Sequence, residues 1–162
     1  MIQRTPTHLY YLNIASVVAK RSSCIRSMYG AVIVKDDVIK STGYNGSCRG
    51  AVNCCDTGVC RREGVKSRTG FEDCPAIHAE ENAIIFSSPQ DRKGSTIYIS
   101  AFGVKTGEFI EKSGSECYPC YRCLRKLTNG GIEYICVKGN DGYPEIHHIS
   151  NLQKIDPLSF KP

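Results

Sequence analysis

Two short motifs contain residue types that bind a catalytic metal. His78 is followed two residues later by Glu80, and Cys120 is followed three residues later by Cys123. A neutral imidazole and two thiolates fill three corners of a tetrahedral zinc site and leave the fourth corner for water. A carboxylate close to that corner can take a proton from the water and pass it to a leaving group. The two motifs therefore predict hydrolytic zinc chemistry, with Glu80 as the proton carrier.

Each motif has a simpler explanation when it is taken alone. A Cys-x-x-Cys pair is equally typical of a redox centre or a structural zinc, and a helical histidine usually packs in a core. Cys117 extends the cysteine series and offers a different set of ligands, but its position before Tyr118 and Pro119 makes it the weaker candidate. The histidine, the acid and the cysteine pair in this order favour a catalytic zinc.

The elements around the motifs must bring them together. Residues two apart on a helix do not face each other, so His78 and Glu80 can share a site only above a helix end. The sequence predicts helices that begin at Pro75 and at Pro119, with the motif residues in their first turns. We therefore expect the N-terminal ends of the two helices to converge. Their backbone amides and positive dipole ends favour the thiolate form that zinc requires.

The rest of the chain alternates between helical and strand patterns, which indicates a mixed sheet layered between helices. Residues 44–74 lack an apolar period and are long for a structureless loop, so something other than a core must order them. The other elements expected are a helix from Thr5 to about Arg21, β-rich runs at 31–34 and 38–39, strands at 97–99, 132–137 and about 146–149, and a hairpin around 104–109.

Composition restricts the class of protein. A chain of 162 residues with 41% hydrophobic content predicts one domain, residues 1–162, with a core of its own. The formal charge of +5 is spread among acidic residues, which suits a phosphate-bearing ligand without requiring nucleic acid. No apolar run approaches the ~20 residues that span a bilayer, and the N-terminus has no signal-peptide pattern. We expect a cytoplasmic protein without a membrane partner.

Ten cysteines predict metal binding better than disulfides in such a chain, and most of them fall into two clusters. The cluster outside the catalytic motif contains Cys24, Cys55, Cys60 and Cys74, and Cys54 competes with Cys55 for one position. Four cysteines can close a tetrahedral structural zinc. Such a site would order residues 44–74, because metal-binding energy becomes folding energy.

Two alternatives to this second zinc remain open. Cys48 and His8 are possible ligands from outside the four-cysteine set. Several of these cysteines can also be small buried hydrophobic residues, as free cysteines often are.

Over about residues 8–138 the chain resembles the cytidine and deoxycytidylate deaminase superfamily, and most closely its deoxycytidylate branch. The resemblance includes the zinc motifs, Arg21 to Cys24, Gly30 to Val34, and the run from Ser41 to Gly46, which is typical of that branch. It implies an α/β fold of three α/β/α layers with a five-stranded mixed sheet. It also implies zinc-dependent conversion of a cytosine nucleotide to the uracil form with release of ammonia, dCMP to dUMP being the expected reaction.

The resemblance further assigns roles to single residues. The residue that matches Asn45 lies by the sugar of the substrate, and an arginine that matches Arg26 contacts the phosphate. Ala79 and Tyr118 are further candidate substrate contacts. Many family members are homohexamers that dCTP activates and dTTP restrains, so these effectors and this assembly are expected partners.

One segment departs from the family pattern, and two other functions remain open. In the family the strand that matches 97–100 leads almost directly into the Pro-Cys motif, whereas residues 101–118 intervene here and could form a lid, an oligomer contact or a changed pocket wall. A deaminase acting on tRNA adenosine or single-stranded DNA would need a basic groove with stacking aromatics. Candidates for such a groove are Arg61, Arg62, Lys66, Arg68 and Phe71. A non-catalytic zinc or nucleotide-binding module would lack the acid, and Glu80 is present.

Overall fold

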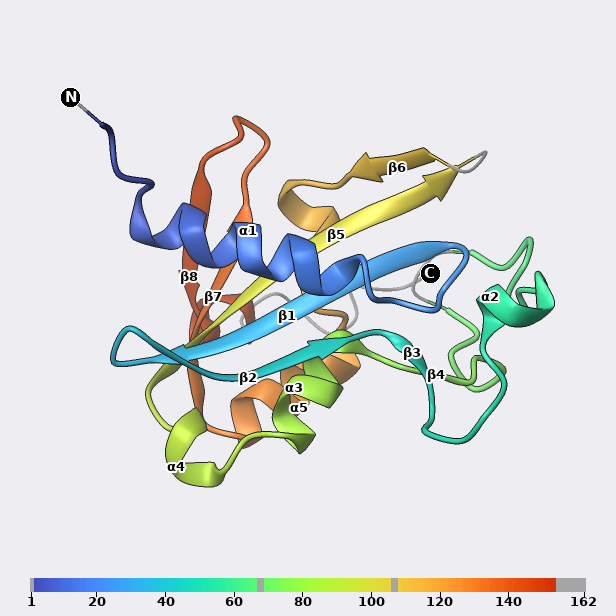
Figure 1. Ribbon diagram of the computed structural model, residues 1–162. Helices are drawn as coiled ribbons and strands as arrows, with labels where there is room; N and C mark the ends of the chain where they lie inside the picture. Colours follow the sequence, from blue (N-terminus) through green and yellow to red (C-terminus); the bar gives the residue numbers. More distant parts are fainter. Residues whose placement is uncertain (1, 67–68, 106–107, 154–162) are drawn as a thin grey trace.

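The computed structural model describes residues 2–66, 69–105 and 108–153 (Figure 1). Its helices are α1 (Thr7–Ala19), α2 (Cys54–Thr57), α3 (Ala79–Ile85), α4 (Pro89–Arg92), α5 (Tyr121–Asn129) and α6 (Ile149–Gln153), with a 3₁₀ turn at Gly114–Glu116. Its strands are β1 (Ser27–Lys35), β2 (Val38–Tyr44), β3 (Gly46–Ser47), β4 (Ala76–Ile77), β5 (Ser95–Lys105), β6 (Glu108–Glu111), β7 (Ile132–Lys138) and β8 (Pro144–His148). Within these ranges no helix is both long and apolar enough to cross a membrane.

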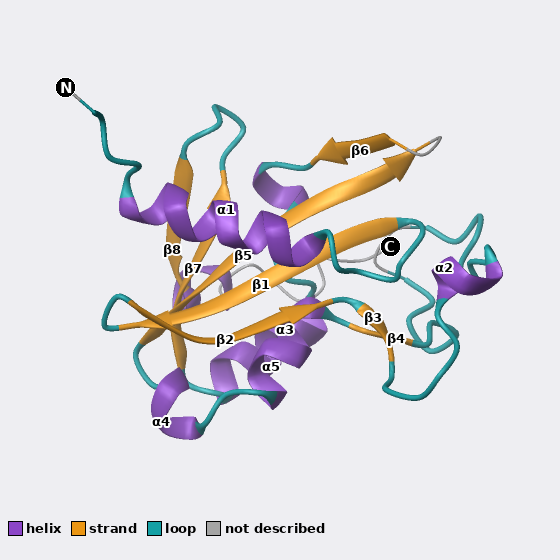
Figure 2. Ribbon diagram, viewed as in Figure 1, coloured by secondary structure: helices purple, strands orange, loops and turns teal. Residues whose placement is uncertain are grey.

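A mixed sheet lies between α1 on one face and α3 and α5 on the other (Figures 1 and 2). Its main strands follow the order β2-β1-β5-β7-β8, and β6 pairs with β5 at one end. Strands β5 and β7 are parallel, whereas the other neighbours are antiparallel. The expected three layers and the five-stranded mixed sheet are therefore confirmed, with β6 as an addition.

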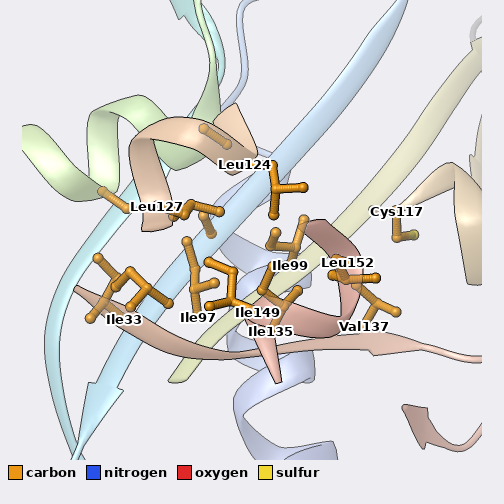
Figure 3. Close-up of a cluster of buried hydrophobic side chains, with 14 of the residues drawn as sticks. Ile33, Ile97, Ile99, Cys117, Leu124, Leu127, Ile135, Val137, Ile149 and Leu152 are labelled. Carbon is orange, nitrogen blue, oxygen red and sulfur yellow. The ribbon is translucent and has the colours of Figure 1, made fainter. Parts of the chain in front are cut away.

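Successive side chains of the central strands point alternately to the two faces of the sheet, because a strand repeats every two residues. Ile33 and Ile97 pack with Leu127 of α5 in the larger core cluster (Figure 3). Val32 and Tyr98, each next to one of those isoleucines in sequence, pack instead in the cluster that contains α1. Both faces of β1 and β5 are thus buried, and the helices α3 and α5, which begin at the two motifs, pack on one of these faces.

The two motif-bearing helices begin later than the proline positions predict. Ala76–Ile77 pairs with Gly46–Ser47 as strand β4 against β3, so these residues are extended and cannot form a first helical turn. His78 also has extended backbone, with φ −73° and ψ 156°, and is the N-cap of α3. Cys120 is the N-cap of α5 in the same way. Each first ligand therefore precedes its helix, and the predicted starts at Pro75 and Pro119 were wrong.

The segment 101–118 extends the sheet. Strand β5 continues beside β1 as far as the pair Gly103 and Ser27, so the short strand predicted at 97–99 is longer than expected. The expected hairpin is confirmed by the pairing of Val104 with Phe109, although its residues 106–107 lie outside the described ranges. The short helices α4 and α6 were not predicted, although Ser88, Pro89 and Asp91 form a capping box with proline at the first helical position of α4.

Gly43 allows α3 to approach β2 closely. A Cβ atom at this position would lie 2.3 Å from the carbonyl oxygen of Ala79 and 2.4 Å from the backbone nitrogen of Ala83. Both atoms are helix backbone, so neither can move away by a rotamer change. Residue 43 is glycine because the start of the metal-binding helix is held against it.

We predict that Gly43→Ala lowers the free energy of unfolding by roughly 1–3 kcal/mol, as overpacking of a tight contact does. Urea denaturation of the wild type and the variant measures the difference. Gly103→Ala is the matched control on β5, because its Cβ would meet nothing closer than 3.6 Å. Equal stability of the Gly43 variant and the wild type would contradict this account of the helix contact.

Candidate metal centre and substrate pocket

The three predicted zinc ligands converge. The Nδ1 atom of His78 lies 3.5 Å from Cys120 Sγ and 3.3 Å from Cys123 Sγ. Among the residues that the structure describes, only these three His, Cys, Asp or Glu side chains have ligand atoms all within 4.8 Å of one another. One imidazole and two sulfurs at the ends of α3 and α5 fit zinc, with a fourth position left for another ligand. The buried Cys117 packs in the core and is not in the group.

A carboxylate connects the start of α3 with the last turn of α5. The backbone nitrogen of His78 donates to Glu81 Oε2 at 3.1 Å. Glu81 also forms an ion pair with Lys126 of α5. Phe71 packs the edge of its ring against the His78 imidazole, with 5.0 Å between ring centroids. The histidine is therefore oriented by neighbours on both sides, as a metal ligand requires.

The two cysteine side chains are hydrogen-bonded to each other. The pKa of Cys120 falls to about 4, chiefly because the Cys123 thiol donates a hydrogen bond to it, with His78 assisting. The pKa of Cys123 is raised for the same reason, by its hydrogen bond to the Cys120 thiolate and by burial. Cys120 is thus the more acidic of the two thiols, and a divalent cation bound between the two sulfurs would stabilise the thiolate form of both.

Glu80 is buried beside this group, with 4% of its surface exposed. Burial raises the pKa of its carboxyl, and the Cys120 thiolate acts in the same direction. A carboxyl that can hold a proton next to a metal site suits proton transfer in hydrolysis. It is the second residue of α3, so it reaches the site over the helix end, as the spacing from His78 predicts.

One pocket contains His78, Glu80 and Cys120 together with all four residues predicted to contact substrate. Those four are Asn45, Arg26, Ala79 and Tyr118. The pocket also includes Tyr29, Phe71 and Lys112, which the sequence motifs did not single out as ligand contacts. Phe71 is among the residues predicted for a strand-binding groove, and Lys112 lies in a segment without a motif, so only the fold places both in this pocket.

Asn45 holds the pocket wall together. Its Oδ1 accepts hydrogen bonds from the Tyr29 backbone nitrogen and the Ser22 hydroxyl, both at 2.7 Å. Its Nδ2 donates to the Ser27 carbonyl at 2.9 Å. The amide thereby fixes the start of β1 against the end of β2. Contact with a substrate sugar stays a prediction for this residue.

Arg26 and Tyr118 direct their polar atoms toward protein partners. The Arg26 guanidinium donates to the backbone carbonyls of Arg62 and Val65, at 2.7 and 2.6 Å. The Tyr118 hydroxyl lies 2.8 Å from His147 Nε2 and 3.1 Å from Glu145 Oε2 on β8. Burial and the hydrogen bond to Glu145 raise the Tyr118 pKa to about 12, so this phenol stays neutral.

The cysteines of the second cluster lie near one another, although among the described residues no three of them have sulfur atoms all within 4.8 Å of one another. The pKa of Cys54 is raised by burial and by the nearby thiols of Cys24, Cys60 and Cys74. Cys55 is exposed, and its thiol donates to Asp56 Oδ1 at 3.5 Å. All ten cysteines are free thiols. Cys54, unlike Cys55, is thus close enough to Cys24, Cys60 and Cys74 for their thiols to influence its pKa.

Comparisons with known proteins agree with this geometry. The model of the cytidine and deoxycytidylate deaminase zinc-binding region matches residues 5–138. The deoxycytidylate deaminase of Mycobacterium phage D29 is 35% identical over 133 residues, which cover 78% of this chain and 89% of the phage protein. The deoxycytidylate deaminase of Schizosaccharomyces pombe is 34% identical over 128 residues, and the match covers only 35% of that longer protein.

A solved structure shows the same fold. The crystal structure of dCMP deaminase from the cyanophage S-TIM5 in complex with dCMP and dUMP superposes with a TM-score of 0.61 at 23% identity, covering 94% of each chain. The matched region of the family model includes both zinc motifs and Glu80. With the three ligands assembled at the two helix ends, this chain belongs to the cytidine and deoxycytidylate deaminase zinc-binding family.

Proposed function

We propose that this protein catalyses the zinc-dependent hydrolytic deamination of dCMP to dUMP, with release of ammonia. The observation that carries the proposal is the buried Glu80 carboxyl, which lies beside the His78, Cys120 and Cys123 group in one pocket. The names of the phage and yeast relatives support deoxycytidylate as the substrate. So does the dCMP bound to the structural neighbour.

The chain's own residues account for the proton movements. Zinc held by His78, Cys120 and Cys123 would supply water activated for attack at neutral pH. Glu80 takes a proton from the attacking water and gives it to the ring nitrogen next to the carbon under attack. It then carries the second proton to the exocyclic nitrogen. The bond from carbon to water oxygen forms, the bond from carbon to the amine breaks, and ammonia leaves.

The residues that line the pocket fit a small nucleotide better than a nucleic-acid strand. A strand-binding groove would present its cations outward, between stacking aromatics. Arg62 instead lies over the Phe71 ring, 4.7 Å from its centroid, and donates to carbonyls of its own loop. Arg68, another residue considered for such a groove, lies outside the described ranges. Substrate contacts by Asn45, Arg26, Ala79 and Tyr118, assembly as a hexamer and regulation by dCTP and dTTP stay predictions.

We predict that the purified protein releases ammonia from dCMP with a higher kcat/KM than from CMP, deoxycytidine or a cytosine in single-stranded DNA. Glu80→Gln should keep its zinc and lose roughly 10²- to 10⁴-fold in kcat, because it removes the proton carrier. Glu133→Gln, on the exposed part of β7, is the control and should match the wild type. Zinc is counted by mass spectrometry in each variant.

Two results would contradict this assignment. Absence of turnover on every cytosine nucleotide in zinc-loaded wild type would remove the proposed function. Substantial turnover by the Glu80 variant would leave the reaction in place and remove this residue from its role.

We also propose a second, structural zinc held by Cys24, Cys54, Cys60 and Cys74. The mutual influence of these thiols supports it, and the exposed thiol of Cys55 supports Cys54 as the fourth ligand. The backbone nitrogen of Cys55 donates to the Ser23 carbonyl at 3.1 Å, which holds α2 against the segment that contains Cys24. Four thiolates around one cation would order a loop that has little core of its own.

We predict about two zinc ions per chain in freshly purified wild type. Cys54→Ser should lower the count to about one and reduce thermal stability, because the loop loses its metal. Cys55→Ser is the matched control at the neighbouring position and should keep both ions. A count near one zinc ion per chain in the wild type would contradict the second site. Loss of zinc from the Cys55 variant but not from the Cys54 variant would show that Cys55 is the fourth ligand.

A further inference from the structure

Lys112 brings a cation from the inserted segment 101–118 into the pocket. It follows β6, and its ammonium nitrogen lies 3.4 Å from Ser27 Oγ and 3.5 Å from Tyr29 OH. The same nitrogen is 5.4 Å from the centroid of the Tyr29 ring. Lys112 lines the pocket that contains His78 and Glu80. The insertion therefore adds a charge to the site.

The two arginines of this pocket are already engaged. Both terminal nitrogens of Arg26 donate to backbone carbonyls of the loop that begins after Cys60. Arg62 is also bound to carbonyls of this loop and stacks on Phe71. These guanidinium groups position the loop, and moving either onto a ligand would leave backbone carbonyls without their donors.

Lys112 is held much less tightly at its charged end. Its two hydroxyl partners are at the long limit of a hydrogen bond. In the described ranges, no carboxylate oxygen lies within 4.0 Å of its ammonium nitrogen. A flexible four-carbon stem lets such an ammonium turn toward an anion without disturbing the fold.

The backbone beneath Lys112 is nevertheless fixed. The backbone nitrogen of Lys112 donates to the Ala101 carbonyl at 2.8 Å. On β6, Glu111 forms an ion pair with Lys138 of β7 at 2.6 Å. A flexible side chain on a fixed backbone can bring its ammonium group to one group of a ligand in a defined position.

We propose that Lys112 binds the 5′-phosphate of the substrate and selects a nucleoside monophosphate over the free nucleoside. This inference rests on the proposed deamination of a cytosine nucleotide. Glu80 is the acidic residue among the described pocket-lining residues, and it belongs to the metal end. The ammonium of Lys112 and the dianionic phosphate form a charge-assisted hydrogen bond that the Ser27 and Tyr29 hydroxyls cannot equal.

The test compares dCMP with deoxycytidine in zinc-loaded wild type, Lys112→Met and Lys112→Arg. Lys112→Met should lower kcat/KM for dCMP roughly 10- to 100-fold through KM, as loss of a hydrogen bond between charged groups does. Its kcat/KM for deoxycytidine should stay within twofold of the wild type. Lys112→Arg should keep most of the preference for dCMP over deoxycytidine, because it keeps a cation at this position. Lys138→Met is the control, because it disturbs the same hairpin away from the pocket.

Calorimetric titration of dCMP and deoxycytidine into the same proteins separates this inference from the proposed function. We expect the wild type to bind dCMP more tightly than deoxycytidine and Lys112→Met to lose this difference. That result supports phosphate binding by Lys112 even where turnover is absent. Equal losses for both ligands would show that Lys112 only maintains the pocket, and would overturn the inference. An unchanged preference in Lys112→Met, or equal binding of both ligands by wild type, would overturn it as well.

Discussion

The site depends on the convergence of two helix N-termini over one end of the pocket. His78 and Cys120 are both N-caps, and Cys123 is one turn further along its helix. A residue at an N-cap has extended backbone, so its side chain can reach across the helix end. Two such residues on neighbouring helices can therefore share one metal ion, and the helix behind His78 brings Glu80 to the same place.

Packing on the sheet and the pairing of two very short strands maintain this convergence. Gly43 lets α3 lie directly on β2, and β3 and β4 hold the chain extended up to His78. Glu81 then connects the His78 backbone with Lys126 on the second helix. The ligands are thus positioned by protein contacts of different kinds. By contrast, the cysteines of residues 24–74 have no comparable core beneath them.

Local spacing predicts the parts of this site that local geometry determines. The group of His78, Cys120 and Cys123 and the neighbouring Glu80 follow from residues two or three apart at helix ends, and the sequence indicates them directly. The exact helix starts do not follow, because pairing between residues 46–47 and 76–77 overrides the helix-start signal of Pro75. The choice between Cys54 and Cys55 has the same origin. Adjacent residues of a short helix point in different directions, so the proposal of Cys54 as the ligand depends on the tertiary structure.

Long-range register decides the remainder of the pocket. Lys112 reaches Ser27 and Tyr29 because β6 folds back along β5, where Phe102 pairs with Glu111, and β5 in turn pairs with β1. No pattern around Lys112 could have indicated these neighbours, since they are more than eighty residues away. The segment 101–118 lengthens an existing ladder and adds buried residues to the core, with Phe102 packing against Met28 and Cys117 in the larger cluster. The result is a pocket with its acid and metal ligands at the helix ends, and a cation supplied from the added hairpin. Proton chemistry and anion recognition are thereby separated onto different elements, and each can change without displacing the other.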